Sequence, residues 1–405
     1  METLQKLYDM TAFGELASSP GSILMLAISF FLLYLGIHKR YEPLLLVPIA
    51  FGVLLANLPG GNMSVTQDTP LNNISNLTLL NIAKEHGIMN LLYYSLIKTG
   101  LLPPLIFMGV GAMTDFGPML RNLKLAFFGA AAQIGIFTAL LSAVAFGFSL
   151  PQAGALGIIG GADGPTAIYT AIILAPELLG PIAIAAYSYM ALVPVIIPFI
   201  VNLTMSKKEL KINMKQQEKK YPNKTVIKNI KMVKIIFPIV LATLVALLVP
   251  TSVPLVGMLL FGNLIKEIGT DTNRLFIAAS ETIMNTATIF LGLTVGATMT
   301  ASSFLTSETL FIVVGGFFAF AISIVGGIMA AKVHNLFAAK KINPLIGATG
   351  LSAVPMASRV ANEIALKHDR QNHILQYAMS SNISGVIGSA VAAGVLISFL
   401  KEFII

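Results

Sequence analysis

The 405-residue sequence contains no cysteine and no tryptophan, and only 11% of its residues are charged. Without cysteine there can be no disulfide, thiolate nucleophile or thiolate metal site, and without tryptophan any aromatic belt at a membrane interface must consist of tyrosine and phenylalanine. Hydrophobic residues make up 56% of the chain, which excludes a soluble domain of this length. The sequence therefore predicts an all-α polytopic membrane protein.

Positive charge is concentrated in one segment. The formal net charge is +8, which could point to nucleic acid, but ten lysines lie between residues 207 and 234, with apolar runs on both sides. Such a cluster marks the cytoplasmic side of a membrane protein, and nucleic-acid binding is not expected. Residues 1–20 are mixed polar and contain no basic leader followed by an apolar core, so no cleavable signal peptide is expected.

Apolar runs and flanking basic residues predict spans and two re-entrant hairpins. The expected spans are residues 21–38, 41–58, 99–120, 125–150, 181–203, 233–250, 251–264, 282–302, 309–331 and 374–400. Residues 152–176 begin and end on the outer side of these spans, whereas residues 343–366 begin and end beside cytoplasmic lysines. They are therefore predicted to be hairpins that enter from opposite sides. Residues 62–86 are expected to be an external loop or a surface helix.

Several motifs occur twice. A Val-Pro pair precedes Asn57 by the same interval at which a second Val-Pro pair precedes Asn263, and residues 107–114 recur with a short insertion as residues 290–300. Inverted repeats with broken helices are the architecture of ion-coupled transporters. The predicted units are the first repeat (1–203, with the Asp163 hairpin), a basic cytoplasmic loop (204–232) and the second repeat (233–405, with the Ser352 hairpin).

Asp163 is the residue around which the first hairpin is interpreted. It lies in the sequence Gly-Gly-Ala-Asp-Gly-Pro (160–165) and is the only carboxylate between Asp115 and Glu177. An ionised Asp at bilayer depth costs about 2.5–3.5 kcal/mol on insertion scales. Glycine and proline also break the helix and free backbone groups for an ion. We interpret the stretch as an ion site; the alternative is that Asp163 only caps the half-helix that begins at Pro165.

The second hairpin supplies Asn343, Ser352 and Arg359. A hard cation such as sodium prefers oxygen ligands, which Asn, Ser and freed carbonyls provide. Helix-end capping is the alternative role for Asn343 and Ser352. Arg359 is expected to be buried, and a guanidinium at membrane depth needs a partner or an anionic ligand.

Two further polar residues lie in apolar spans. Tyr189 is either an interfacial belt residue or a ligand and proton donor. Asn382 either serves close helix packing or completes a sodium site. The histidines stand at segment ends without metal-ligand spacing, so no catalytic role is assigned to them.

Five stretches carry a resemblance to a known family. They are residues 41–46, 107–116, 160–168, 186–194 and 343–359. With these motifs the chain resembles, over nearly its whole length, the beta subunits of the sodium-pumping biotin-dependent decarboxylases of oxaloacetate, methylmalonyl-CoA, glutaconyl-CoA and malonate. Departures from the family are expected at residues 62–86 and in the lysine-rich segment, neither of which is expected to touch the motif residues.

The resemblance implies that carboxybiotin carried by a partner is decarboxylated at this subunit while sodium is exported and a proton is consumed. The implied partners are a carboxytransferase with a biotin carrier domain or protein, a small single-span membrane subunit and further copies of the chain, in the inner membrane of a prokaryote. The residues implied for the reaction are Asp163, Tyr189 and Arg359, with Arg359 beside carboxybiotin. Those implied for sodium are Asp163, Tyr189, Asn343 and Ser352, which Asn382 would join.

Two other classes of protein remain open from the residues alone. A sodium-coupled secondary transporter of a carboxylate or a proton would use the same repeats and hairpins without a biotin partner. A structural membrane anchor would not need Asp163.

Overall fold

The computed structural model describes residues 10–40, 42–65, 79–161, 164–222, 229–353 and 355–403. Within these ranges the chain forms helices and connections and contains no β-strand. Seven of the described helices are long and apolar enough to cross a membrane, or up to nine if each of two bent pairs is one span. The prediction of an all-α polytopic membrane protein is confirmed.

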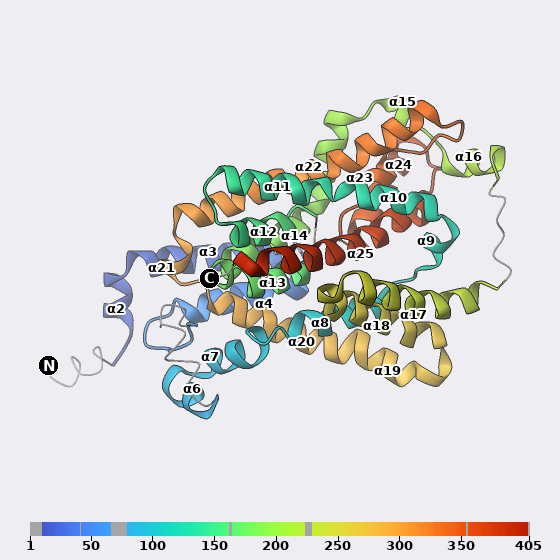
Figure 1. Cartoon of the computed structure of the whole chain (residues 1–405). Helices are drawn as coiled ribbons and strands as arrows, with labels where there is room; N and C mark the ends of the chain where they lie inside the picture. The colour runs from blue at the N-terminus through green and yellow to red at the C-terminus, as the bar shows by residue number, and fades with distance from the viewer. Residues whose placement is uncertain are drawn as a thin grey trace.

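The long helices run along one axis of an elongated bundle (Figure 1). They are α3 (Pro20–Ile37), α10 (Leu123–Ala132) with α11 (Ile134–Ala145), α14 (Leu179–Thr204), α17 (Ile230–Leu248), α18 (Val253–Ile268), α20 (Met284–Ala297), α22 (Ser307–Phe337) and α25 (Leu375–Leu400). Large apolar side chains such as Phe127, Leu141 and Leu247 are exposed on their outer faces. Lipid tails are the surroundings in which such faces are stable.

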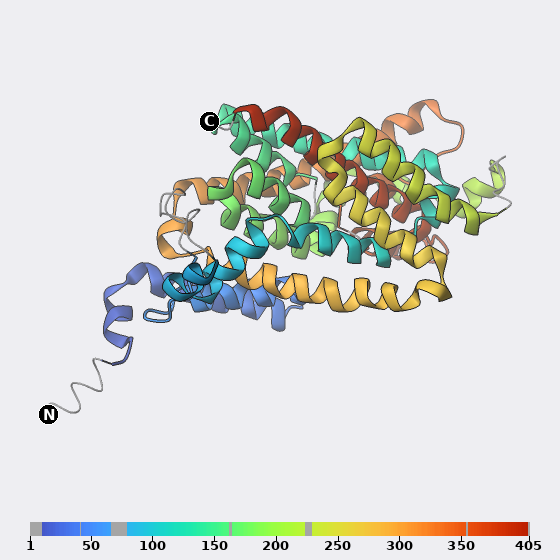
Figure 2. The same cartoon turned by 60° about the horizontal axis from the view of Figure 1, so that its bottom comes forward.

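Helices from the two halves of the chain pack against each other. Helix α4 (Pro43–Ala56) lies along α20, and α8 (Leu102–Met113) lies along α18. Figure 2 shows α20 beside the blue helix α4. A methyl group at Gly52 of α4 would lie 2.2 Å from the carbonyl oxygen of Leu293, and one at Gly262 of α18 would lie 1.9 Å from that of Met108. Glycine therefore sets both close approaches, as in other membrane helix pairs.

Two asparagines join the halves of the chain. Each bonds a backbone carbonyl just after the end of a helix in the other half. The Nδ2 of Asn57 donates to the carbonyl of Met299, just after α20, at 2.8 Å. The Nδ2 of Asn263 donates to the carbonyl of Thr114, just after α8, also at 2.8 Å. Asn57 and Asn263 occupy corresponding places in the repeated motif, and each satisfies a carbonyl that its partner helix leaves free.

Two helix pairs meet at a bend. The helix of residues 88–97 meets α8 at 65°, and α14 bends by 64° between Met190 and Leu192. Gly100, at φ +72°, turns the chain before α8. Pro194 removes the amide that would otherwise bond the carbonyl of Met190, so the second bend also has a local cause.

The hairpins are pairs of short helices buried in the bundle. The first is α12 (Leu150–Ile158) and α13 (Gly164–Leu174); α12 packs on α11, α13 packs on α14, and both contact α25 (Figure 1). The second is α23 (Leu345–Ala348) and α24 (Met356–His368). At 9 and 11 residues, α12 and α13 are each about half as long as a span needs to be.

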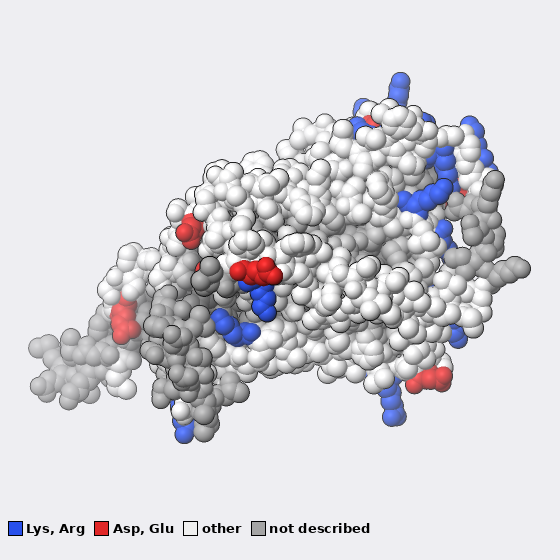
Figure 3. Space-filling view, in the orientation of Figure 1, with Lys and Arg blue, Asp and Glu red and all other residues white. Residues whose placement is uncertain are grey.

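The first part of the lysine-rich segment, residues 207–222, is folded and packs on the second hairpin. It forms α15 (Lys207–Leu210) and α16 (Met214–Lys220) at the end of the molecule where Lys and Arg gather (Figure 3). The Nδ2 of Asn343 donates to the carbonyls of Leu210 and Ile212, at 3.1 and 3.0 Å. The expectation that this segment would not touch the motif residues is wrong, because the free carbonyls after α15 take their donors from the hairpin.

Candidate functional site

The break between the two short helices of each hairpin lies against the junction of α10 and α11. A methyl group at Gly160 of the first hairpin would lie 2.6 Å from the carbonyl oxygen of Gly135. One at Gly350 of the second hairpin would lie 2.7 Å from both the carbonyl oxygen of Phe128 and the Cβ of Ala132. The two breaks therefore meet one short stretch of backbone, and the glycines permit the approach.

The break of the second hairpin is held by α25. The Nδ2 of Asn382 donates to the carbonyls of Thr349 and Leu351, at 3.0 and 2.5 Å, and Thr349 Oγ1 bonds the carbonyl of Ala378 at 2.9 Å. Asn382 is fully buried, and its Oδ1 has no hydrogen-bond partner among the described residues. The structure thus places Asn382 beside the segment that carries Ser352, which is 3% exposed. Asp163 lies outside the described residues.

Tyr189 packs behind the first hairpin. Its ring lies against α22, where a methyl group at Gly316 would be 2.8 Å from the ring and 3.1 Å from Ile159, which closely follows α12. Its ring centroid is 6.2 Å from that of Phe317 and 6.4 Å from that of Phe320. The side chain is 4% exposed, and the hydroxyl makes no hydrogen bond of normal geometry among the described residues. A position in an interfacial belt does not fit this burial.

Asn343 and Arg359 lie apart from the two breaks. The amide oxygen of Asn343 accepts from Leu345 N at 3.0 Å, so both ends of the amide are bonded to backbone. Arg359 is exposed, contrary to the sequence expectation, and makes no ion pair within the described ranges. It shares the outer face of α24 with Glu363 and Lys367, at intervals of four residues, while the opposite face packs on α14 and α25.

Gln133 is a polar residue of this region that sequence reasoning missed. It stands between α10 and α11, is 7% exposed, and donates to the carbonyls of Gly129 and Gly385 at 3.1 and 3.3 Å. The available signal was that Gln133 is the one amide in the apolar run 125–150. Its importance depends on contacts with distant segments, which one sequence does not show.

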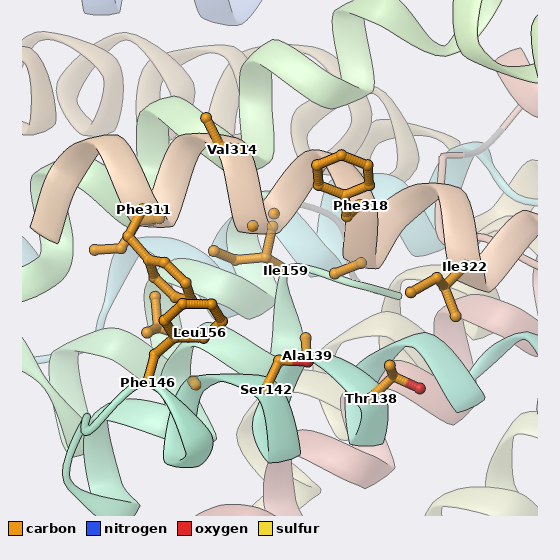
Figure 4. A pocket seen from close by; sticks show the side chains of 15 residues that line it. Thr138, Ala139, Ser142, Phe146, Leu156, Ile159, Phe311, Val314, Phe318 and Ile322 are labelled. Carbon is orange, nitrogen blue, oxygen red and sulfur yellow. The ribbon is translucent and has the colours of Figure 1, made fainter.

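An apolar groove lies between α11 and α22 (Figure 4). Its volume is about 300 Å³, and Phe146, Phe311 and Phe318 are among the residues that line it. Leu156 and Ile159 also line it, and no charged side chain does. This lining offers no site for an ion.

A polar pocket of about 450 Å³ lies at the lysine-rich end of the molecule. It is lined by Lys215 and Lys219 of α16 and by Arg370 and His373 of the connection between α24 and α25, with amide side chains between them. Among the described residues no carboxylate lines it, so the pocket favours an anionic group. Asn213 on its wall donates to Asp369 at 2.9 Å.

The arrangement suits a monovalent cation better than a transition metal. Within the described ranges no three His, Cys, Asp or Glu residues are grouped closely enough to hold a metal ion. Buried amide and hydroxyl oxygens instead gather beside broken helices, and such oxygens are what a hard cation binds.

Comparisons with known proteins agree with this geometry. The family whose model matches residues 21–400 is described as the Na+-transporting oxaloacetate decarboxylase beta subunit. The oxaloacetate decarboxylase beta chain of Haemophilus ducreyi is 44% identical, with 100% of both chains covered. The methylmalonyl-CoA decarboxylase subunit beta of Propionigenium modestum is 47% identical over 98% of this chain and 99% of its own. The chain belongs to the family of Na+-transporting decarboxylase beta subunits.

Proposed function

We propose that this subunit decarboxylates carboxybiotin presented by a partner and uses the reaction to export sodium while a proton is consumed. The observation that carries the proposal is the meeting of two broken hairpins beside buried oxygens, in a chain whose family transports Na+. Relatives named for oxaloacetate and for methylmalonyl-CoA match equally well. That is expected if the acid itself is handled by another subunit.

The sodium site is proposed to lie where the hairpins end. Asp163 would supply the charge, and Ser352 and Asn382 would supply neutral oxygens, because Asn382 bonds the segment that carries Ser352. Tyr189 and Ile159 both lie close to Gly316, so Tyr189 is near the first break, and it is proposed to join the site through its hydroxyl. Asn343 was expected to be a ligand, but its bonded amide supports a role in fixing the base of the second hairpin.

The reaction needs an attracting cation and a proton. In carboxybiotin the bond between the ureido nitrogen and the carboxyl carbon breaks, carbon dioxide leaves, and the electron pair left on nitrogen takes a proton. Arg359, exposed on α24, is proposed to attract the anionic carboxyl group from the cytoplasmic side. Tyr189 is proposed to donate or relay the proton, and Asp163 to couple sodium to the reaction.

The wider assembly is also a proposal. The reciprocal contacts of Asn57 and Asn263 support two inverted repeats, 1–203 and 233–405, joined by the cytoplasmic segment 204–232. The partners would be a carboxytransferase with a biotin carrier, a small single-span subunit and further copies of this chain, in the inner membrane of a prokaryote.

The basic pocket is the surface proposed for the carrier protein. Lys215, Lys219 and Arg370 line it without an opposing carboxylate. It lies over α16, at the end of the bundle rather than along its lipid-facing sides (Figures 1 and 3). A soluble acidic partner can reach this end, and complementary charge would speed its encounter.

The test compares two substrates of the purified complex. We expect release of carbon dioxide from free carboxybiotin to require sodium. The double variant Lys215→Glu with Lys219→Glu should raise KM for the carboxylated carrier by about tenfold or more, because steering charge is reversed, and leave turnover of free carboxybiotin at the parent level. Arg274→Glu, an exposed cation on α19 (Asn273–Ile277), is the control.

Each outcome decides between alternatives. Equal loss with both substrates, or no loss, would reject carrier docking at the pocket. A complex that moves sodium with no action on carboxybiotin would instead support a sodium-coupled secondary transporter.

A further inference from the structure

The side chain of Gln133 is fixed in one orientation. Its Nε2 donates to the carbonyls of Gly129 and Gly385, at 3.1 and 3.3 Å. The reversed amide would set an oxygen against these two carbonyl oxygens, so the hydrogen bonds determine which end is which. The Oε1 therefore points away from both carbonyls, and it has no hydrogen-bond partner among the described residues.

That oxygen faces the break of the first hairpin. A methyl group at Gly161 would lie 2.9 Å from Gln133 Oε1. Asp163 follows Gly161 by two positions in the sequence. The side chain is 7% exposed, so bulk water does not solvate the oxygen.

Two more buried oxygens lie on the helix that Gln133 bonds. Ser381 Oγ and Asn382 Oδ1 are on α25, one turn before Gly385, and neither has a hydrogen-bond partner within the described ranges. Both residues are 0% exposed. Buried acceptors without donors are costly unless a cation or an ordered water meets them. Here the acceptors are neutral oxygens beside broken helices, which suits sodium.

We propose that Gln133 Oε1 is a ligand of the transported sodium ion at the break of the first hairpin. The inference rests on the proposed function, since it assumes that the chain binds the ion it transports. Through Nε2 the same side chain is bonded to α25, which also holds the second hairpin through Asn382. Gln133 is thus the residue by which sodium at one hairpin alters the helix that supports the other.

The test is direct binding of radioactive sodium to the purified complex, with no substrate present. Gln133→Leu keeps the size of the side chain and removes the oxygen. Supporting residues of metal sites contribute about 10–100-fold to affinity, so this variant should raise the half-saturating sodium concentration by about tenfold or more. The sodium concentration that gives half-maximal thermal stabilisation should rise by the same factor.

Asn57→Leu is the matched control. Asn57 is a buried amide, 5% exposed, that also donates to two backbone carbonyls, but it lies between α4 and α20. Its loss should lower thermal stability and leave the half-saturating sodium concentration unchanged. Should Gln133→Leu fail to assemble, Gln133→Asn, which retracts the oxygen by one methylene, takes its place with the same direction of change expected.

The outcomes separate this inference from the proposed function. If the parent complex binds sodium and the Gln133 variants bind it with unchanged half-saturation, then Gln133 Oε1 is held by water or by packing and the inference is rejected. If the parent complex binds no sodium at all, the proposed function fails as well.

Discussion

At the scale of single residues, some polar side chains of the candidate site have all their polar atoms hydrogen-bonded to backbone, and others keep an oxygen that could bind an ion. Asn343 has both ends of its amide bonded to backbone, whereas among the described residues Asn382 and Gln133 are each bonded only through nitrogen. Tyr189 is buried, and its hydroxyl makes no hydrogen bond of normal geometry with the described residues. An oxygen already committed to a backbone amide has less to offer an ion, so availability separates supporting residues from candidate ligands.

Tyr189→Phe should separate chemistry from stability. The hydroxyl makes no hydrogen bond of normal geometry in the part of the chain that the structure describes, so its removal should leave the melting temperature unchanged or slightly raised. If the hydroxyl donates the proton, kcat with carboxybiotin should fall about 10²-fold or more. The measurement is kcat across pH together with thermal unfolding.

Tyr377→Phe is the control for that experiment. Its hydroxyl donates to Glu218, so this variant should lose stability and keep the parent pH profile. A Tyr189→Phe complex with the parent kcat at every pH would remove Tyr189 from the reaction.

At the scale of elements, local patterns predicted most of the helices but not their mutual contacts. Apolar runs gave most of the spans, but the predicted span 41–58 is the 14-residue α4, which is shorter than a candidate span. Glycine, proline and flanking charge led to both pairs of short helices. The bend of α14 and the fold of α15 and α16 were not predicted. The bend depends on Pro194 acting at one position inside a long apolar run, and the basic segment is ordered by Asn343, more than a hundred residues away in sequence.

The site was predictable only in part for the same reason. Helix breaks and an isolated charge can be read from one sequence, and they led to Asp163 and Ser352 as candidates. Asn382 was a candidate because it is a polar residue in an apolar span. Gln133 was not singled out because its meaning comes from Gly161 and Gly385, which lie in other helices. Arg359 was expected to be buried, but α24 presents it on the face opposite its packed side.

An ion cluster ties the end of α8 to α17 and α18. Lys234 Nζ lies 2.6 Å from Asp115 and 3.5 Å from Glu267, and Lys266 bonds the carbonyl of Thr114 at 3.0 Å. Burial alone would raise the pKa of Asp115, but Lys234 and the amide of Gly117 bring that pKa below its ordinary value. The cluster therefore stabilises the fold only while Asp115 is ionised.

The lowered pKa of Asp115 predicts how the stability of the fold depends on pH. A carboxyl group whose folded-state pKa is lowered contributes stability above its unfolded pKa of about 3.9, and the contribution disappears as pH falls through the folded value. Because Asp115 is half exposed, Asp115→Asn should cost only about 1 kcal/mol at neutral pH. The difference from the parent should shrink below about pH 4.

The check is thermal unfolding of the purified chain at several pH values. Asp271→Asn, an exposed carboxylate between α18 and α19, is the control and should change little. A destabilisation by Asp115→Asn that persists unchanged at low pH would show that the ion pair is not its cause.

At the scale of the whole molecule, two kinds of contact join the N-terminal and C-terminal halves of the chain. Helix pairs α4 with α20 and α8 with α18 pack closely through glycine, and both hairpins end on the α10–α11 junction. Rigid scaffolds around a central site are how transporters expose an ion to one side at a time. An ion bound at the shared junction would therefore affect both hairpins.

The central claim is that decarboxylation drives sodium through the site at these hairpins. The most direct measurement is uptake of radioactive sodium into vesicles that contain the purified complex with its cytoplasmic side outward, started by adding the acid that the complex decarboxylates. We predict sodium accumulation that stops when decarboxylation stops, and neither accumulation nor sodium-dependent turnover in an assembled Asp163→Asn complex. Full decarboxylation without sodium uptake by the parent, or normal uptake by Asp163→Asn, would contradict the account.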